Sequence, residues 1–161
     1  MVDKIFAPWR SEYILSGDVP DGCIFCDYPR QNKDAQNLII HRGATCFVIM
    51  NRYPYSAGHL MVIPYRHLND FTQLNDKEVA ELMQTAQKAV AVLSKVMSPH
   101  GFNLGMNLGR VAGAGIDQHL HLHVVPRWNG DTNFMPVVGD TRVISEALES
   151  AYARIKEAWN D

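Results

Sequence analysis

The stretch HLHLHVVPR, residues 119–127, places three histidines in alternation with apolar residues. A period of two is typical of a strand, because successive side chains of a strand point to opposite faces. The pattern predicts a strand over residues 119–125 that ends at Pro126. Neighbouring imidazoles on one face would lie about 7 Å apart at the backbone, while the leucines and valine between them pack against the core. The three imidazoles are those of His119, His121 and His123.

Three interpretations of this histidine row compete. The row could be a half-exposed surface without chemistry, or a metal site, since neutral imidazole is a common zinc or iron ligand. It could also act on phosphorus, with one imidazole attacking to give a phosphohistidine-type intermediate. The loop at residues 109–115 favours the third, because its glycines let the backbone come close to a ligand and offer N–H groups to phosphate oxygens.

The remaining pattern predicts an α+β domain. Its clearest helix carries an apolar stripe from Val79 to Met97, begins with a capping box of Asn75 and Glu78, and stops before Pro99. A second helix is expected near the C-terminus. Only one long helix separates the strands, so a mostly antiparallel sheet is expected rather than repeated βαβ units. The other strands are predicted at 44–50, 59–64 and 102–107, and the C-terminal helix at 143–159.

Composition limits the class of protein and its partners. With 161 residues, 47% of them hydrophobic and 20% charged, residues 1–161 suit a single globular domain. Prolines and glycines punctuate residues 8–30, so residues 1–40 are expected to form an irregular N-terminal segment. A net charge of −2 argues against nucleic acid or an anionic membrane surface as partner, and neither a signal peptide nor a membrane span is expected.

The cysteines point to a reducing compartment. Three is an odd count, and two of them, Cys23 and Cys26, are separated by two residues. A metal-binding or redox pair in the cytoplasm therefore fits better than a secreted disulfide scaffold.

The histidine row matches the pattern H-φ-H-φ-H-φ-φ, where φ is apolar, and by it the chain resembles the histidine triad (HIT) superfamily of nucleotide hydrolases and transferases. The segment HLMVIP at 59–64 is similar to a second family strand. The pieces APWR (7–10), CIFC (23–26) and PRWNGDTNF (126–134) resemble the branch of bacterial diadenosine tetraphosphate phosphorylase-like proteins. The resemblance implies a HIT-like fold and a homodimer.

The resemblance also implies a role for each histidine. His121 would be the nucleophile that attacks the α-phosphorus of a nucleotide and holds the nucleoside monophosphate covalently. His123 would donate to phosphate or serve the leaving oxygen, and His119 would orient its neighbour or bind a metal. His59 would lie near His121 and bind its other ring nitrogen through backbone geometry or water, with structural packing as an equal alternative.

For the substrate, Asn51 matches a position that binds the ribose hydroxyls, although an Asn that merely forms a turn is an open alternative. Asn107 matches a polar position that contacts phosphate. Relatives carry Gly-Gln-Ser just before the triad, whereas this loop has no hydroxyl, which leaves the source of the leaving-group proton open. Backbone amides remain to bind phosphate, those of Gly113, Ala114 and Gly115. Two side chains are further candidates, Asp117 and Gln118.

A zinc site is implied by the same resemblance. His67 stands where bacterial relatives place a zinc-binding histidine, and His119 is the usual fourth ligand beside Cys23 and Cys26. Two cysteines and two histidines make a closed structural site, which would fasten the N-terminal segment to the sheet as a clip. The alternative is a reduced, metal-free cysteine pair.

The functional hypothesis is an enzyme that cleaves dinucleoside polyphosphates or related nucleotides through a nucleotidyl-His121 intermediate. Water as acceptor makes it a hydrolase, and phosphate makes it a diadenosine tetraphosphate phosphorylase. The competing hypotheses are a nucleotide-binding regulatory module with weak turnover and a metal-binding protein that uses the histidine row.

Overall fold

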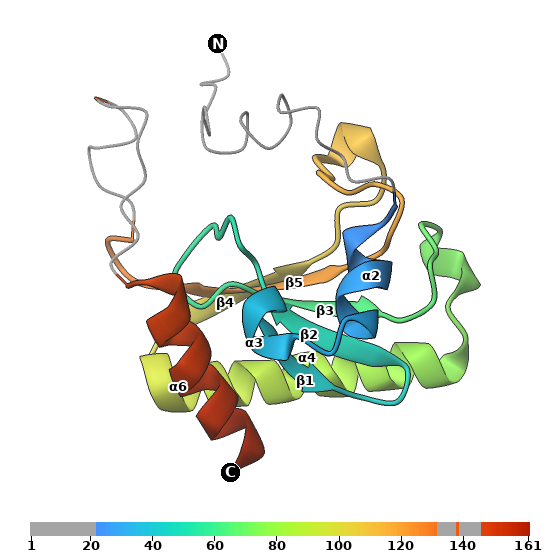
Figure 1. Ribbon diagram of the computed structural model, residues 1–161. Coiled ribbons are helices and arrows are strands. Elements are labelled where there is room, and N and C mark those ends of the chain that lie inside the picture. Colours follow the sequence, from blue (N-terminus) through green and yellow to red (C-terminus); the bar gives the residue numbers. More distant parts are fainter. Residues whose placement is uncertain (1–21, 132–137, 139–145) are drawn as a thin grey trace.

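A five-stranded antiparallel sheet forms the centre of the protein, for which a computed structural model describes residues 22–131, 138 and 146–161 (Figure 1). The strand order is β1-β2-β3-β5-β4. The predicted α+β class and antiparallel sheet are therefore confirmed. The strands are β1 (Ile39–Arg42), β2 (Cys46–Met50), β3 (Leu60–Pro64), β4 (Gly101–Gly105) and β5 (Leu122–Arg127).

The long helix α4 (Asp76–Met97) runs along one side of the sheet, in contact with β2, β3 and β5 (Figure 1). It begins as predicted, because the Asn75 side chain accepts from the Glu78 backbone N–H while the Glu78 carboxylate accepts from the Asn75 N–H. Its apolar stripe is buried at Leu82, Ala86, Ala89 and Leu93. No helix among the described residues is long and apolar enough to cross a membrane.

The C-terminal helix α6 (Leu148–Asn160) packs on α4 and β1. The predicted start at residue 143 is corrected within the described residues, since positions 146 and 147 are not helical; residues 143–145 lie outside them. Trp159 and Ile155 on its inner face are almost fully buried. Burial of these side chains stabilises a helix that has no side-chain cap at Ala147.

The expectation of an irregular segment over residues 1–40 is wrong for its second half. Two short helices, α2 (Ile24–Arg30) and α3 (Asp34–Asn37), precede β1. Pro29 lies within α2, which is why sequence punctuation argued against a helix. Burial of Phe25, which is 2% exposed, stabilises α2 despite the proline. Residues 1–21, including the piece at 7–10, lie outside the described residues.

Strand β5 also differs from its prediction. It begins at Leu122, so His119 and His121 precede it, and it continues through Pro126 to Arg127. The proline is tolerated because β3 pairs with β5 only over Leu122–Val124, leaving β4 as the strand partner of Pro126. Strand β4 ends at Gly105, two residues earlier than predicted.

Candidate active site and metal centre

The three histidines of the row are buried, with exposures of 1% for His119, 6% for His121 and 7% for His123. The ring centroids of His121 and His123 lie 4.8 Å apart. Strand pairing sets Gly105, the last residue of β4, opposite His123, so the glycine-rich loop leaves the sheet beside the row. Burial excludes a half-exposed surface without contacts as the explanation of the row.

His121 has a defined tautomer. Its Nδ1 lies 2.8 Å from the backbone oxygen of His119. A carbonyl only accepts, so Nδ1 carries the proton and Nε2 keeps its lone pair. Burial lowers the pKa of His121, which favours the neutral ring at pH 7. The arrangement therefore presents a neutral, correctly protonated nitrogen that can attack an electrophile.

A hydrogen-bond chain sets the tautomer of His123. The backbone N–H of Tyr55 donates to Nδ1 of His59 over 3.1 Å, so the proton of neutral His59 resides on Nε2. That Nε2 lies 2.9 Å from Nδ1 of His123 and donates to it. The proton of neutral His123 is then on its Nε2. This chain gives the site a donor next to the attacking ring.

The expected bond between His59 and His121 is not what the structure shows. The second ring nitrogen of His121 is bonded to the carbonyl of His119, and His59, which is fully buried, bonds to His123 instead. The sequence could not distinguish the two partners because both follow from the same alternation.

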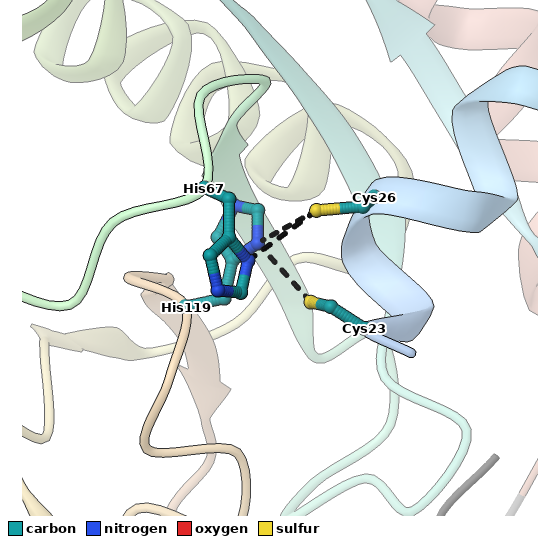
Figure 2. Close-up of side chains that lie close together, drawn as sticks. All are labelled: Cys23, Cys26, His67 and His119. Atoms are coloured by element: carbon teal, nitrogen blue, oxygen red, sulfur yellow. Dashed lines mark hydrogen bonds between the residues drawn. The ribbon is translucent and has the colours of Figure 1, made fainter. Parts of the chain in front are cut away.

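The metal-binding residues of the prediction come together in one cluster, the Cys/His cluster, as Figure 2 shows. Nδ1 of His119 lies 3.2 Å from Sγ of Cys23 and 3.6 Å from Sγ of Cys26, and Nδ1 of His67 lies 3.4 Å from Sγ of Cys26. The four ligand atoms all lie within 4.8 Å of one another. The N-terminal end of helix α2 supplies both sulfurs, Cys23 from the residue just before the helix and Cys26 from its first turn, and the segments around His67 and His119 supply the nitrogens (Figure 2).

The cluster fits a tetrahedral zinc ion. Bonds of about 2.3 Å to sulfur and about 2.0 Å to nitrogen separate neighbouring ligand atoms by roughly 3.3–3.8 Å, and the three measured distances are close to that range. His119 is prepared as a ligand, because its Nε2 donates to the Pro64 carbonyl over 2.8 Å and leaves the Nδ1 lone pair toward the cysteines. Burial lowers the pKa of His119 to about 4, so the ring is neutral, as a ligand must be.

The predicted substrate-binding residues shape the two loops beside the row. Oδ1 of Asn51 accepts from the Tyr53 backbone N–H over 2.9 Å, so Asn51 does form the turn that was its alternative role. Its Nδ2 lies 3.4 Å from Nδ1 of His59. In the other loop, Nδ2 of Asn107 donates to the Gly113 carbonyl over 3.4 Å and closes the loop.

The glycine-rich loop has the backbone that its sequence suggested. Gly109 and Gly113 adopt φ values of 81° and 89°, which side chains disfavour. Gly113 and Gly115 are exposed and Ala114 is half-buried. Of the two further candidates, Asp117 pairs with Arg110 over 3.2 Å and Gln118 is exposed.

Two aromatic residues of the site were missed by sequence reasoning. Phe25 lies in α2 between Cys23 and Cys26 and contacts the rings of both His119 and His121. Tyr55 lies with its ring centroid 4.5 Å from that of His59 and 5.5 Å from that of His123. The position of Phe25 inside the CIFC piece was the only available signal, and it requires the fold to be interpreted.

An antiparallel sheet with a buried row of histidines beside a glycine-rich loop defines the histidine triad class. The chain belongs to the HIT family: residues 32–130 match the family model described as HIT domain. It is 39% identical over 166 residues to the AP-4-A phosphorylase of Mycobacterium tuberculosis, covering 98% of this chain and 85% of that protein. The predicted superfamily and branch are thereby confirmed.

Other relatives agree with this assignment. The adenosine 5'-monophosphoramidase hnt1 of Schizosaccharomyces pombe is 29% identical over 107 residues, 66% of this chain and 75% of the relative. The crystal structure of a Zn-bound histidine triad family protein from Mycobacterium smegmatis superposes with a TM-score of 0.69 at 26% identity, covering 86% of this chain and 94% of that one. The chain is a HIT-type enzyme.

Proposed function

We propose that the protein, as a single HIT domain, cleaves dinucleoside polyphosphates or related nucleotides at the α-phosphate through a nucleotidyl-His121 intermediate. The observation that carries this proposal is the bond from Nδ1 of His121 to the His119 carbonyl, which leaves Nε2 with its lone pair. The AP-4-A phosphorylase relative, at 39% identity, supports a diadenosine tetraphosphate as substrate.

In the proposed first step, Nε2 of His121 attacks the α-phosphorus. The N–P bond forms, the bond to the leaving phosphate oxygen breaks, and the leaving group departs as a nucleoside polyphosphate. The Nε2–H of His123, held there by the bond from His59, donates to the leaving or a neighbouring phosphate oxygen. The Nε2–H of His123 would therefore supply the leaving-group proton, which the glycine-rich loop cannot supply because it has no hydroxyl.

The loops would bind the substrate around this centre. Backbone amides of Gly113, Ala114 and Gly115 would bind phosphate oxygens, and Asn107 would keep that loop closed while contacting phosphate. Asn51 would bind the ribose hydroxyls, in addition to its bond in the turn.

In the second step, the acceptor attacks the same phosphorus and the N–P bond breaks, which regenerates His121. We propose inorganic phosphate as acceptor, by analogy with the phosphorylase relative. Product analysis of diadenosine tetraphosphate with and without phosphate tests this. ADP and ATP formed only with phosphate support a phosphorylase, AMP and ATP formed with water indicate a hydrolase, and binding without products favours the regulatory module.

We also propose that zinc occupies the Cys/His cluster. The ligand set of two sulfurs and two nitrogens supports zinc, as does the Zn-bound neighbour of known structure. Burial and the neighbouring Cys23 raise the pKa of Cys26 to about 11, so a dication is needed to stabilise thiolate there. Bound zinc would supply no step of the reaction, since four protein ligands leave it no open position; it would hold α2 against His119. Zinc bound to thiolates would suit a reducing compartment, so we also propose a cytoplasmic location.

A homodimer is proposed from the two edges of the sheet. At one edge, the carbonyls of β1 are already bonded by side chains of α6. Lys156 donates to the carbonyls of Ile39 and Ile40, and the Tyr152 hydroxyl donates to the Ile39 carbonyl. The opposite edge is β4, where the apolar Leu104 is 45% exposed. An edge strand with an exposed leucine is suited to pair with a second copy. Light scattering should give twice the chain mass, and Leu104→Lys should shift it toward the monomer.

A further inference from the structure

The start of helix α2, where both sulfurs of the Cys/His cluster lie, also places an aromatic ring against the proposed nucleophile. Phe25 lies in α2 between Cys23 and Cys26 and is 2% exposed. Its ring centroid is 5.6 Å from that of His119, edge-on, and 5.3 Å from that of His121, tilted by 53°. One side chain therefore touches both a ligand of the cluster and the attacking imidazole.

Phe25 has little freedom to leave this position. The backbone N–H groups of Cys26 and Asp27 both donate to the carbonyl of Cys23, over 2.9 and 3.0 Å, which closes the turn around Phe25. The sulfurs before and after it both face Nδ1 of His119. Anything that binds the two sulfurs and His119 together also holds the Phe25 ring in place.

His121 needs such support. In the proposed reaction its Nε2 must stay available, so the bond from Nδ1 to the His119 carbonyl is the hydrogen bond that can hold the ring. One hydrogen bond leaves the ring free to rock about that bond, and packing has to prevent it. The rings of Phe25 and His123, with centroids 5.3 and 4.8 Å from that of His121, provide that packing.

We propose that Phe25 is a positioning residue for His121, and that the Cys/His cluster acts on the nucleophile through it. The cluster would then be more than a clip for the N-terminal segment: metal bound to α2 and His119 fixes the aromatic ring that fixes the attacking ring. This inference rests on the proposed role of His121 in turnover, but whether Phe25 holds the His121 ring can be measured without turnover.

The kinetic test uses Phe25→Leu in the metal-loaded protein. The variant keeps an apolar side chain but removes the flat ring. Turnover number should fall about 10- to 100-fold, because small misplacements of a reacting group cost about that much, while KM changes little. Zinc content should stay as in the wild type. Phe25→Met, which fills a similar volume, replaces the leucine variant if that variant fails to fold.

The matched control is Phe47→Leu. Phe47 is fully buried, and its ring stacks on Tyr65 with centroids 5.4 Å apart. The control removes an aromatic ring from the core at comparable cost in stability without touching the site. Equal losses of turnover in the two variants would show that Phe25 acts only through core packing, as Phe47 does, and would overturn the proposal.

The second readout is the ring of His121 itself. Nitrogen-15 NMR of histidine-labelled protein, with the His121 signal assigned by its absence in His121→Asn, reports which ring nitrogen carries the proton. Wild type should show the Nδ1–H tautomer, whereas Phe25→Leu, and wild type stripped of metal by a chelator, should show mixed tautomers. Wild-type ring signals in Phe25→Leu would sink the inference. If His121→Asn retained turnover, the proposed function would be wrong, but the NMR signals of the His121 ring in Phe25→Leu would still test whether Phe25 holds that ring.

Discussion

His119 and His121 are two residues apart in the same alternating histidine row, yet each ring leaves a different nitrogen available. Nε2 of His119 is anchored on the Pro64 carbonyl, so its Nδ1 faces two thiols. Nδ1 of His121 is anchored on the His119 carbonyl, so its Nε2 is the nitrogen left for chemistry. The position of one backbone carbonyl decides which lone pair a histidine offers, and thereby whether it suits a metal or an electrophile.

His119 and His121 share one electrostatic property, a lowered pKa. Burial lowers the pKa of both rings, to about 4 for His119, and both are therefore neutral at pH 7. A neutral ring is required of a zinc ligand and of a nucleophile alike. Geometry, not charge, distinguishes the ring that we propose binds zinc from the ring that we propose attacks phosphorus.

Replacing the proposed nucleophile should have the largest effect on the difference between these two histidines. His121→Asn keeps a similar volume but removes the attacking nitrogen, so turnover should fall by several orders of magnitude with little change in nucleotide affinity. Acid-labile labelling by a substrate labelled at the α-phosphorus should vanish, while zinc content stays unchanged. If His121→Asn kept near-normal turnover while His119→Asn or His123→Asn lost the labelling, the nucleophile would be another histidine.

Replacing the neighbouring donor should have a smaller effect, which depends on the substrate. His123→Asn removes the ring that receives the bond from His59, and turnover should fall about 10²- to 10⁴-fold, as for loss of a general acid. The loss should shrink for a nucleotide ester whose leaving group is a stable phenolate, because that group needs no proton. The comparison is made by measuring both substrates on wild type and variant; an equal loss on both would exclude the proton-donor role.

At the Cys/His cluster, Cys23→Ser should remove the proposed zinc ion and lower the melting temperature by about 5–10 °C, the shift expected for a few kcal/mol in a chain of this size. Metal analysis of wild type should give about one zinc per chain. Cys46→Ser is the matched control, since Cys46 is a buried thiol of β2 outside the cluster, bonded to Thr85. Zinc retained in Cys23→Ser, or absent from wild type, contradicts the zinc site.

A change in the N-terminal cap of helix α4 should have the smallest effect. Glu78→Gln removes the charge that binds Arg66 and completes the cap of α4, so the free energy of unfolding at pH 7 should fall by about 1 kcal/mol. Zinc content and labelling should not change.

The same variant has a pH dependence whose sign follows from the structure. The bond from Arg66 lowers the pKa of Glu78 below its ordinary 4.5. The stabilisation by Glu78 is therefore present above pH 4.5 and is lost as the pH falls through the lower folded value. Urea unfolding at several pH values should show the two proteins converging in acid; a constant difference would show that the charge of Glu78 is not what stabilises the cap.

The elements that the sequence predicted well are those whose pattern is local. The capping box and apolar stripe of α4 require only residues within a few turns, and the strands at Cys46–Met50 and Leu60–Pro64 are short apolar runs bounded by turns. Helix α2 was missed because Pro29 argues against a helix locally, and only burial of Phe25 in the assembled core outweighs it.

Residue types and spacing were enough to single out the three histidines of the row, the glycine-rich loop and the cysteine pair, whereas the resemblance to the HIT superfamily was needed to add His67 and His119 as zinc ligands. Their partners were decided by the fold. These three contacts, His59 with His123, Phe25 with His121 and His119 with Cys23, join residues 64 to 96 positions apart in the chain. A sequence pattern specifies which side chains point to a face, whereas ring orientation and tautomer depend on carbonyls and rings that only folding brings within hydrogen-bonding distance.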